Sequence, residues 1–213
     1  MQNKLVVTSN KFSGLAMQIK KLNLLIFLLF FSLNIFSKTL EDGENEYNNK
    51  RYESAFQIWK PLAESGNPFA QTYLCILYEN AQGVTKDYAK AIYWCKLGAE
   101  KNISAALFSL GNFYTNGFGV EKNFKIAFDY YKKSAMLGSN KAQFSVGLSY
   151  FHGQGISKDL IQSLKWLRIA KDNGFEQAKD VSENILFTMK PIDVAKAIAL
   201  ANECIASKYK KCD

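Results

Sequence analysis

Apolar residues in the middle of the chain follow two successive helical patterns. The first has members at i, i+4, i+7 and i+8, which share one face of a helix: Ala106, Leu110, Phe113 and Tyr114. A Gly-x-Gly segment interrupts this pattern, and glycine is the residue that most easily adopts a positive φ after a helix. A second apolar pattern then runs over 127–134. The chain therefore predicts two amphipathic helices joined by a glycine loop, and neither helix can bury its apolar face alone.

The same pattern recurs every 36 residues. Tyr78, Tyr114 and Tyr150 each begin a Tyr-x-x-(Ala/Gly)-x-Gly-(Val/Ile) segment, and each lies 36 residues after the previous one. Other columns keep this step: Ala at 70, 106 and 142, Leu or Val at 74, 110 and 146, and Trp or Tyr at 94, 130 and 166. A period of this length is typical of stacked helical units that form a long surface rather than a closed globule.

Two further columns have a structural role. Asp87, Asn123 and Asp159 follow the glycine loops, where a side-chain acceptor would cap the second helix of each unit. Gly111 and Gly147 occupy a column where a small residue lets two helices approach closely. Both columns are therefore expected to determine stability, and substitutions there should weaken the fold.

The pattern Ala-Gln-x-x-Leu-Gly-x-x-Tyr-x-x-Gly-x-Gly-Val-x-x-Asp-x-x-x-Ala-x-x-Trp resembles the Sel-1-like repeat, a relative of the tetratricopeptide repeat. The resemblance implies an all-α fold, a right-handed α-solenoid of stacked helix-turn-helix repeats with about ten helices and no strand. The predicted organisation is a signal peptide at 1–37, a solenoid at 38–190, and a C-terminal helix with a disulfide-pinned tail at 191–213. Within the solenoid we expect a short N-terminal repeat at 40–67, full repeats at 68–103, 104–139 and 140–175, and a cap helix at 176–190.

The N-terminus carries the pattern of a secretory signal peptide. Lys20 and Lys21 precede an apolar segment whose uninterrupted part, 24–31, has eight residues, and Ser37 follows it. A membrane-spanning helix needs about 20 residues, so a cleaved signal is favoured over an uncleaved anchor or a buried helix. Met17 is an alternative start, since Gln-Ile-Lys-Lys follows it. The predicted location is periplasmic or secreted, with no stable membrane span after cleavage.

The charge of the chain limits the classes of partner. The net charge is +8, but residues 1–37 hold four Lys and no acid. Residues 38–213 then carry 23 Lys and Arg against 19 Asp and Glu, a net charge of +4. A nucleic-acid-binding face needs a denser basic cluster, so no nucleic-acid partner is predicted. The basic tail, with Lys208, Lys210 and Lys211, is interpreted as solvated surface, with attraction to an acidic partner or a lipid surface as the alternative.

Four cysteines in an exported chain raise the question of disulfides. Cys204 and Cys212 would be about 12 Å apart on one unbroken helix, which is too far for a bond. If that helix ends near Ser207, the tail can fold back, and a disulfide between these cysteines is predicted. Cys75 and Cys95 stand in packing columns on facing helices of one unit. A disulfide and two small buried thiols both fit that placement.

Candidate catalytic chemistry is scarce. The sole histidine, His152, stands in a loop column otherwise held by Asn80 and Asn116, and one histidine cannot complete a zinc set. The Gly-x-Gly segments lack a following Gly-Lys-Ser/Thr and are explained by helix termination. Cysteine-rich members of the family are described as penicillin-binding proteins or weak β-lactamases, but this chain lacks their cysteine pair in every repeat. No catalytic residue, metal or cofactor is predicted, and a β-lactamase-like enzyme is the alternative.

The function predicted from the sequence is that of an exported scaffold or adaptor. The resemblance implies that the first helix of each unit faces a concave side, which a protein or peptide partner would contact. Residues about 100° or more from the core column on the helical wheel are free to bind. They are Tyr73, Ile76, Asn80, Ser109, Asn112, Asn116, Ser145, Leu148 and His152. A regulator that binds cell-wall fragments is a further alternative, and no particular oligomeric state is predicted.

Overall fold

The computed structural model describes residues 39–212 and contains, in that range, ten α-helices and no strand. The helices are α2 (Leu40–Asn48), α3 (Tyr52–Glu64), α4 (Pro68–Asn80), α5 (Tyr88–Glu100), α6 (Ser104–Asn116), α7 (Phe124–Met136), α8 (Asn140–His152), α9 (Leu160–Asp172), α10 (Gln177–Leu186) and α11 (Pro191–Ala206). The predicted all-α repeat fold is confirmed. The predicted signal peptide lies outside the described residues, and no helix over 39–212 is long and apolar enough to cross a membrane.

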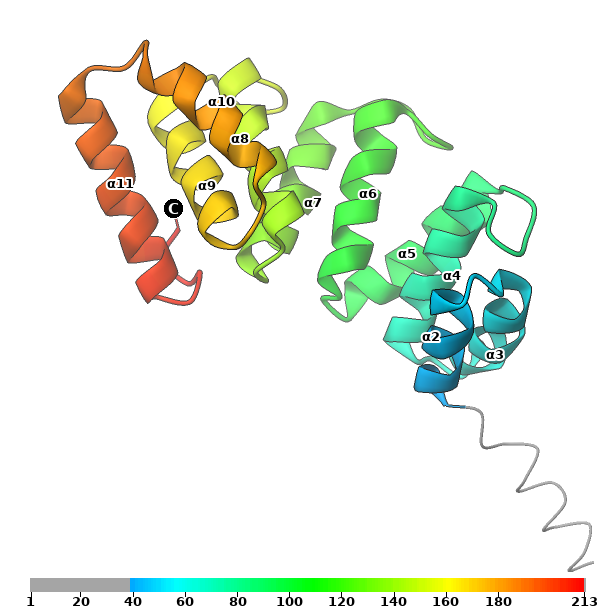
Figure 1. Ribbon diagram of the computed structural model, residues 1–213. Coiled ribbons are helices and arrows are strands. Elements are labelled where there is room, and N and C mark those ends of the chain that lie inside the picture. Colours follow the sequence, from blue (N-terminus) through cyan, green and yellow to red (C-terminus); the bar gives the residue numbers. More distant parts are fainter. Residues whose placement is uncertain (1–38, 213) are drawn as a thin grey trace, which may run out of the picture.

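The helices are stacked two by two in an elongated array, with α2 and α3 at one end and α11 at the other (Figure 1). We call α2, α4, α6 and α8 the first helices and α3, α5, α7 and α9 the second helices of successive units. From α2 to α10 each helix packs mainly on its neighbours in sequence, and α4 also contacts α6. α10 and α11 both pack on α9 and complete the C-terminal end of the array.

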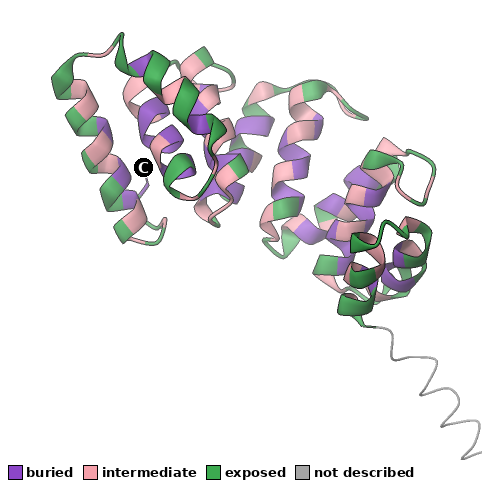
Figure 2. Ribbon diagram, viewed as in Figure 1, coloured by how far each residue is buried: buried purple, intermediate pink, exposed green. Residues whose placement is uncertain are grey.

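The repeat columns form the core. Buried residues lie on the helix faces that meet neighbouring helices (Figure 2). The small and aliphatic columns are fully buried in all three full repeats: Ala70, Leu74, Ala106, Leu110, Ala142 and Val146. The large aromatic column is less uniform, because Trp166 is fully buried whereas Trp94 and Tyr130 are half-buried. The predicted packing columns are therefore confirmed, with the outer part of the aromatic column exposed to solvent in two units.

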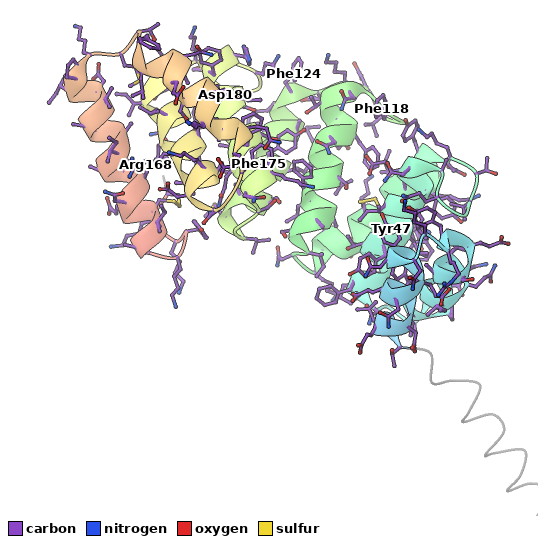
Figure 3. All side chains as sticks on the ribbon, in the orientation of Figure 1. Tyr47, Phe118, Phe124, Arg168, Phe175 and Asp180 are labelled. Carbon is purple, nitrogen blue, oxygen red and sulfur yellow. A yellow bond between two sulfur atoms is a disulfide. The ribbon has the colours of Figure 1, made fainter. Side chains whose placement is uncertain are left out.

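The glycine loops join one unit to the previous one. The first loop residue has a left-handed conformation in each full repeat: Ala81, Gly117 and Gly153. The second glycine also has a positive φ, and a Cβ on it would overlap the residue that begins the preceding second helix. The overlapping positions are Gly83 with Tyr52, Gly119 with Tyr88, and Gly155 with Phe124, which is labelled in Figure 3. Glycine is therefore required here by its conformation and by the close approach of another segment, through its backbone at Gly83 and Gly155 and through the Tyr88 Cβ at Gly119.

The second helices are capped as predicted. Asp87, Asn123 and Asp159 have an extended backbone, and their side chains accept hydrogen bonds from backbone N–H groups in the first turn. The N–H of Lys90 donates to Asp87 Oδ1 at 3.0 Å, and this bond, helped by the Lys90 side chain, lowers the pKa of Asp87. These caps satisfy donors that a helix start otherwise leaves without a partner.

Within each unit one position on the first helix faces one on the second, and in three of the four units a glycine faces a larger residue. The facing positions are Gly43 and Trp59, Cys75 and Cys95, Gly111 and Tyr131, and Gly147 and Leu167. A Cβ on any of these three glycines would overlap the opposite side chain. In the remaining unit the two cysteines form a disulfide with their Cα atoms 5.2 Å apart. Of the two alternatives that the sequence allows for these cysteines, the structure contains the disulfide.

A second disulfide fixes the C-terminal tail. α11 ends at Ala206, and the chain folds back so that Cys212 bonds to Cys204, with a Cα separation of 4.6 Å (Figure 3). The amide of Asn173 donates to the Tyr209 hydroxyl at 2.7 Å, and the buried Lys165 ammonium donates to the Cys212 carbonyl. The tail is thus packed onto α9, while its three lysines at 208, 210 and 211 are exposed.

Candidate binding groove

A groove of about 430 Å³ lies between the first helices α4 and α6 and extends to the turn before α8. Its lining residues are Ile76, Glu79, Asn80, Ser104, Ala105, Phe108, Ser109, Asn112, Leu137, Gly138, Ser139 and Lys141. Four of the nine residues predicted from the sequence are among them: Ile76, Asn80, Ser109 and Asn112. The remaining five lie elsewhere, so the structure brings together only part of the predicted set.

The acidic residue of the groove is Glu79, which the helical-wheel prediction omitted. It lies three residues after Ile76, and this spacing places it on the same face of α4. Burial raises the pKa of the Glu79 carboxyl, while a hydrogen bond with the Ser109 side chain and the charge of Lys86 oppose that rise. Ser109 is only 7% exposed, so its hydroxyl acts mainly by holding Glu79. Glu79 is therefore a half-buried carboxylate whose position is set by the facing helix.

The amide of Asn112 is held by groups behind the groove wall. The Tyr131 hydroxyl donates to Asn112 Oδ1 at 2.8 Å and also lies 3.0 Å from the Thr115 hydroxyl. Burial raises the pKa of Tyr131, which keeps this hydroxyl protonated and able to donate. The bond from Tyr131 fixes the orientation of the Asn112 amide, and within residues 39–212 no group accepts a hydrogen bond from its Nδ2, which can therefore donate to a partner.

The apolar part of the groove comes from Ile76, Phe108 and Leu137. Leu137 is 49% exposed, although it is a large hydrophobic residue, and Phe108 is half-buried. Lys141, in the first turn of α8, is the basic residue of the lining. The groove therefore offers apolar contact, a fixed amide donor, one carboxylate and one ammonium, and these groups together suit a segment with both apolar and polar atoms.

Tyr73, one of the residues predicted to contact a partner, does not line this groove. Its ring stacks on Trp59 with centroids 4.2 Å apart, and its hydroxyl donates to Glu44 of α2 at 2.6 Å. Burial, this bond and the charge of Glu44 raise the pKa of Tyr73 to about 12. Tyr73 thus joins α4 to the N-terminal unit and has a packing role, because the short first repeat covers the surface that the helical wheel left free.

The other four predicted residues lie further along the array. Ser145 and Leu148 line a smaller hollow of about 120 Å³ together with Tyr131. Asn116 ends α6, and its amide donates to the Asn112 carbonyl at 2.9 Å. His152 is exposed at the end of α8, with its ring edge-on to Phe151. These residues continue the same side of the repeats without entering the groove between α4 and α6.

The chain has one Ser-x-x-Lys tetrapeptide, 207–210, a spacing known from serine acylases, and it lies in the C-terminal tail. The Ser207 hydroxyl donates to the Cys204 carbonyl at 2.8 Å and accepts from the Lys211 N–H, so it caps α11. Within the described range, 39–212, no group of three His, Cys, Asp or Glu residues could hold a metal ion.

Comparison with known proteins identifies the repeat. A family model described as the Sel1 repeat matches residues 68–103, 104–139 and 140–175. The chain is similar to a Sel1 repeat protein from Oxalobacter formigenes, with a TM-score of 0.64 and 30% sequence identity over 68% of this chain and 59% of that one. It is also similar to cysteine rich protein B of Helicobacter pylori, with a TM-score of 0.50 and 26% identity over 62% of this chain and 94% of that one.

A third solved structure shares the fold alone. It is a protective antigen of uropathogenic Escherichia coli that displays an SLR fold, with a TM-score of 0.51 and 24% identity over 73% of this chain and 42% of that one. This chain therefore spans less than two thirds of the length of the Oxalobacter and Escherichia proteins. No curated protein matches its sequence.

Proposed function

This chain belongs to the Sel1 repeat family, whose members are generally protein-interaction scaffolds, and we propose that it is a non-catalytic scaffold that binds an extended protein or peptide segment in the groove between α4 and α6. The observation that carries this proposal is the lining of the groove. Its wall positions differ from unit to unit, for example Ile76, Asn112 and Leu148 in one column, whereas the neighbouring core columns stay alike.

The chemistry of the groove suits an extended chain. An extended segment exposes carbonyl groups that need donors, and Asn112 supplies an amide whose orientation is already set by Tyr131. Phe108 and Leu137 supply apolar contact for its side chains. Because both helices are held by packing on their neighbours, little conformational freedom is lost on the side of the scaffold, which favours binding.

A substitution that fills the groove tests this function. Ala105 is exposed, lines the groove and is the second residue of α6, so Ala105→Trp should obstruct the groove without disturbing the core. We expect peptides selected on the wild-type protein from a random dodecapeptide library to bind Ala105→Trp about 10-fold or more weakly, a loss of about 1.4 kcal/mol. Fluorescence anisotropy with labelled peptides measures this, and the melting temperature should stay nearly unchanged.

The matched control is Ala89→Trp. Ala89 is also exposed and also the second residue of its helix, but it lies on the second helix α5 and outside the groove. This variant should bind the selected peptides like the wild type. Peptides that bind Ala105→Trp with unaltered affinity would place the binding surface elsewhere on the array.

We also propose that the protein is exported to the periplasm or secreted. The two disulfides support export, because disulfides persist in oxidising compartments and are rare in the cytosol. The basic and apolar pattern before Lys38 supports it independently. The intact mass of the protein isolated from its own cell should correspond to a chain that begins near Lys38. A mass that still includes residues 24–31 would rule out a cleaved signal.

A further inference from the structure

Charge is distributed unequally between the two layers of helices. The first helices α2, α4, α6 and α8 carry five Asp or Glu residues and a single basic residue, Lys141. The second helices α3, α5, α7 and α9 carry nine Lys or Arg residues against five Asp or Glu. The chain as a whole is basic, yet the first helices are net acidic: four of their five acidic residues lie on α2, outside the groove, and the fifth is Glu79, in the groove. A partner that contacts the first helices at an acidic position should carry positive charge there, and in the groove that position is Glu79.

Within the groove the negative charge is concentrated at Glu79. It is the one acidic residue of the lining, and it lies beside the apolar side chains of Ile76 and Phe108. Glu79 takes part in none of the salt bridges found within residues 39–212, and Lys86 acts on its carboxyl only through its charge. A carboxylate that is partly withdrawn from water is stabilised when a cation with hydrogen-bond donors approaches it.

We propose that the groove recognises its extended segment by a lysine or arginine side chain that pairs with Glu79. This partner chemistry rests on the proposed function, because it concerns the same groove. The ammonium or guanidinium would donate to the Glu79 carboxylate, and Phe108 would contact the aliphatic stem of that side chain. Asn112 Nδ2 would donate to a backbone carbonyl of the segment. Lys141, at the α8 end of the same groove, disfavours a second basic residue there.

The test uses the protein purified as the cell processes it and the random dodecapeptide library. Peptides selected on the wild type should be enriched in Lys or Arg at one position, and the enrichment should be absent from selections on Glu79→Gln. Gln keeps the shape of the side chain and an oxygen that accepts from Ser109. A selected basic peptide should bind Glu79→Gln about 10-fold or more weakly, as expected for a charge-assisted hydrogen bond.

A double-mutant cycle separates a direct contact from an indirect effect. Replacing the basic residue of the peptide by Gln should cost the wild-type protein the same 10-fold or more, and should cost Glu79→Gln little further. Glu121→Gln removes an exposed carboxylate that lies outside the groove lining, so it serves as the charge-matched control and should bind the basic peptide like the wild type. The melting temperature of Glu79→Gln should not fall, because burial disfavours the charged form of Glu79 in the free protein.

The outcomes separate the two proposals. Suppose that Ala105→Trp abolishes binding of the selected peptides, but that these peptides carry no basic residue or bind Glu79→Gln with normal affinity. The groove would then remain the binding site, and the proposed role of Glu79 would be wrong. Selected peptides enriched in Asp or Glu, with an enrichment that is lost in Lys141→Gln, would also contradict the role of Glu79, because the partner would then be acidic. Peptides indifferent to Ala105→Trp, or a library from which none binds, count against the groove itself.

Discussion

Gly155→Ala should lower the free energy of unfolding by about 3 kcal/mol or more, because two separate penalties combine. Gly155 has a φ of 75°, which costs a residue with a Cβ about 1 kcal/mol or more. A Cβ would also overlap the backbone of Phe124, which begins α7 and cannot move without disturbing that helix. The loop of one unit would then separate from the second helix of the previous unit. Urea denaturation followed by circular dichroism measures the loss.

Gly174→Ala is the control that separates the effect of the contact with Phe124 from the effect of the positive φ. Gly174 has a φ of 86°, but a Cβ there meets no atom within 4 Å. This variant should therefore lose only the conformational part, about 1 kcal/mol. The melting temperature of Gly155→Ala should fall about 6–12 °C, if each kcal/mol lowers it by about 2–4 °C. Equal losses in the two variants would show that the contact between the loop and Phe124 contributes nothing to stability.

The sequence predicts the fold well because packing repeats with the chain. A column such as Ala70, Ala106 and Ala142 must be small in every copy, since each unit stacks on the previous one in the same way. The glycine loops and the caps repeat for the same reason. The resulting period of 36 residues identifies the two-helix unit without reference to contacts between distant residues.

The groove is harder to predict because its residues do not repeat. The helical wheel separates core from surface, but it does not say which surface a neighbouring element covers. Tyr73 illustrates this: it satisfies the spacing, yet Glu44 and Trp59 of the shorter first unit cover it. Glu79 illustrates the converse, since its equivalent in the next unit is Thr115, which contacts Tyr131 behind the wall. Only the packing of α4 on α6 places Glu79 beside Ser109 in the groove.

Removal of the Cys75–Cys95 disulfide is the second large effect that we expect. The bond closes a loop of 20 residues, and the chain-entropy estimate for such a loop is about 3 kcal/mol. Cys75→Ala with Cys95→Ala should lose about this much, and the wild type in a reducing agent should lose this amount together with the contribution of Cys204–Cys212. The reducing agent should lower the stability of the double variant only through the remaining bond, Cys204–Cys212. Denaturation curves with and without reductant measure these differences.

The other units suggest how this stability can be recovered without sulfur. Gly147 and Leu167 occupy the positions that correspond to Cys75 and Cys95. The variant Cys75→Gly with Cys95→Leu therefore places the apolar pair of that unit between α4 and α5. The Leu side chain should fill the space that is empty in the double alanine variant, which stabilises the fold by about 2–3 kcal/mol. Gly in place of Ala within α4 should destabilise it by about 1 kcal/mol. We expect this variant to be about 1–2 kcal/mol more stable than the double alanine variant and insensitive to reduction at this site. If it is less stable than the alanine variant, the facing positions of the units are not interchangeable, and the disulfide fills a space that is specific to its own unit.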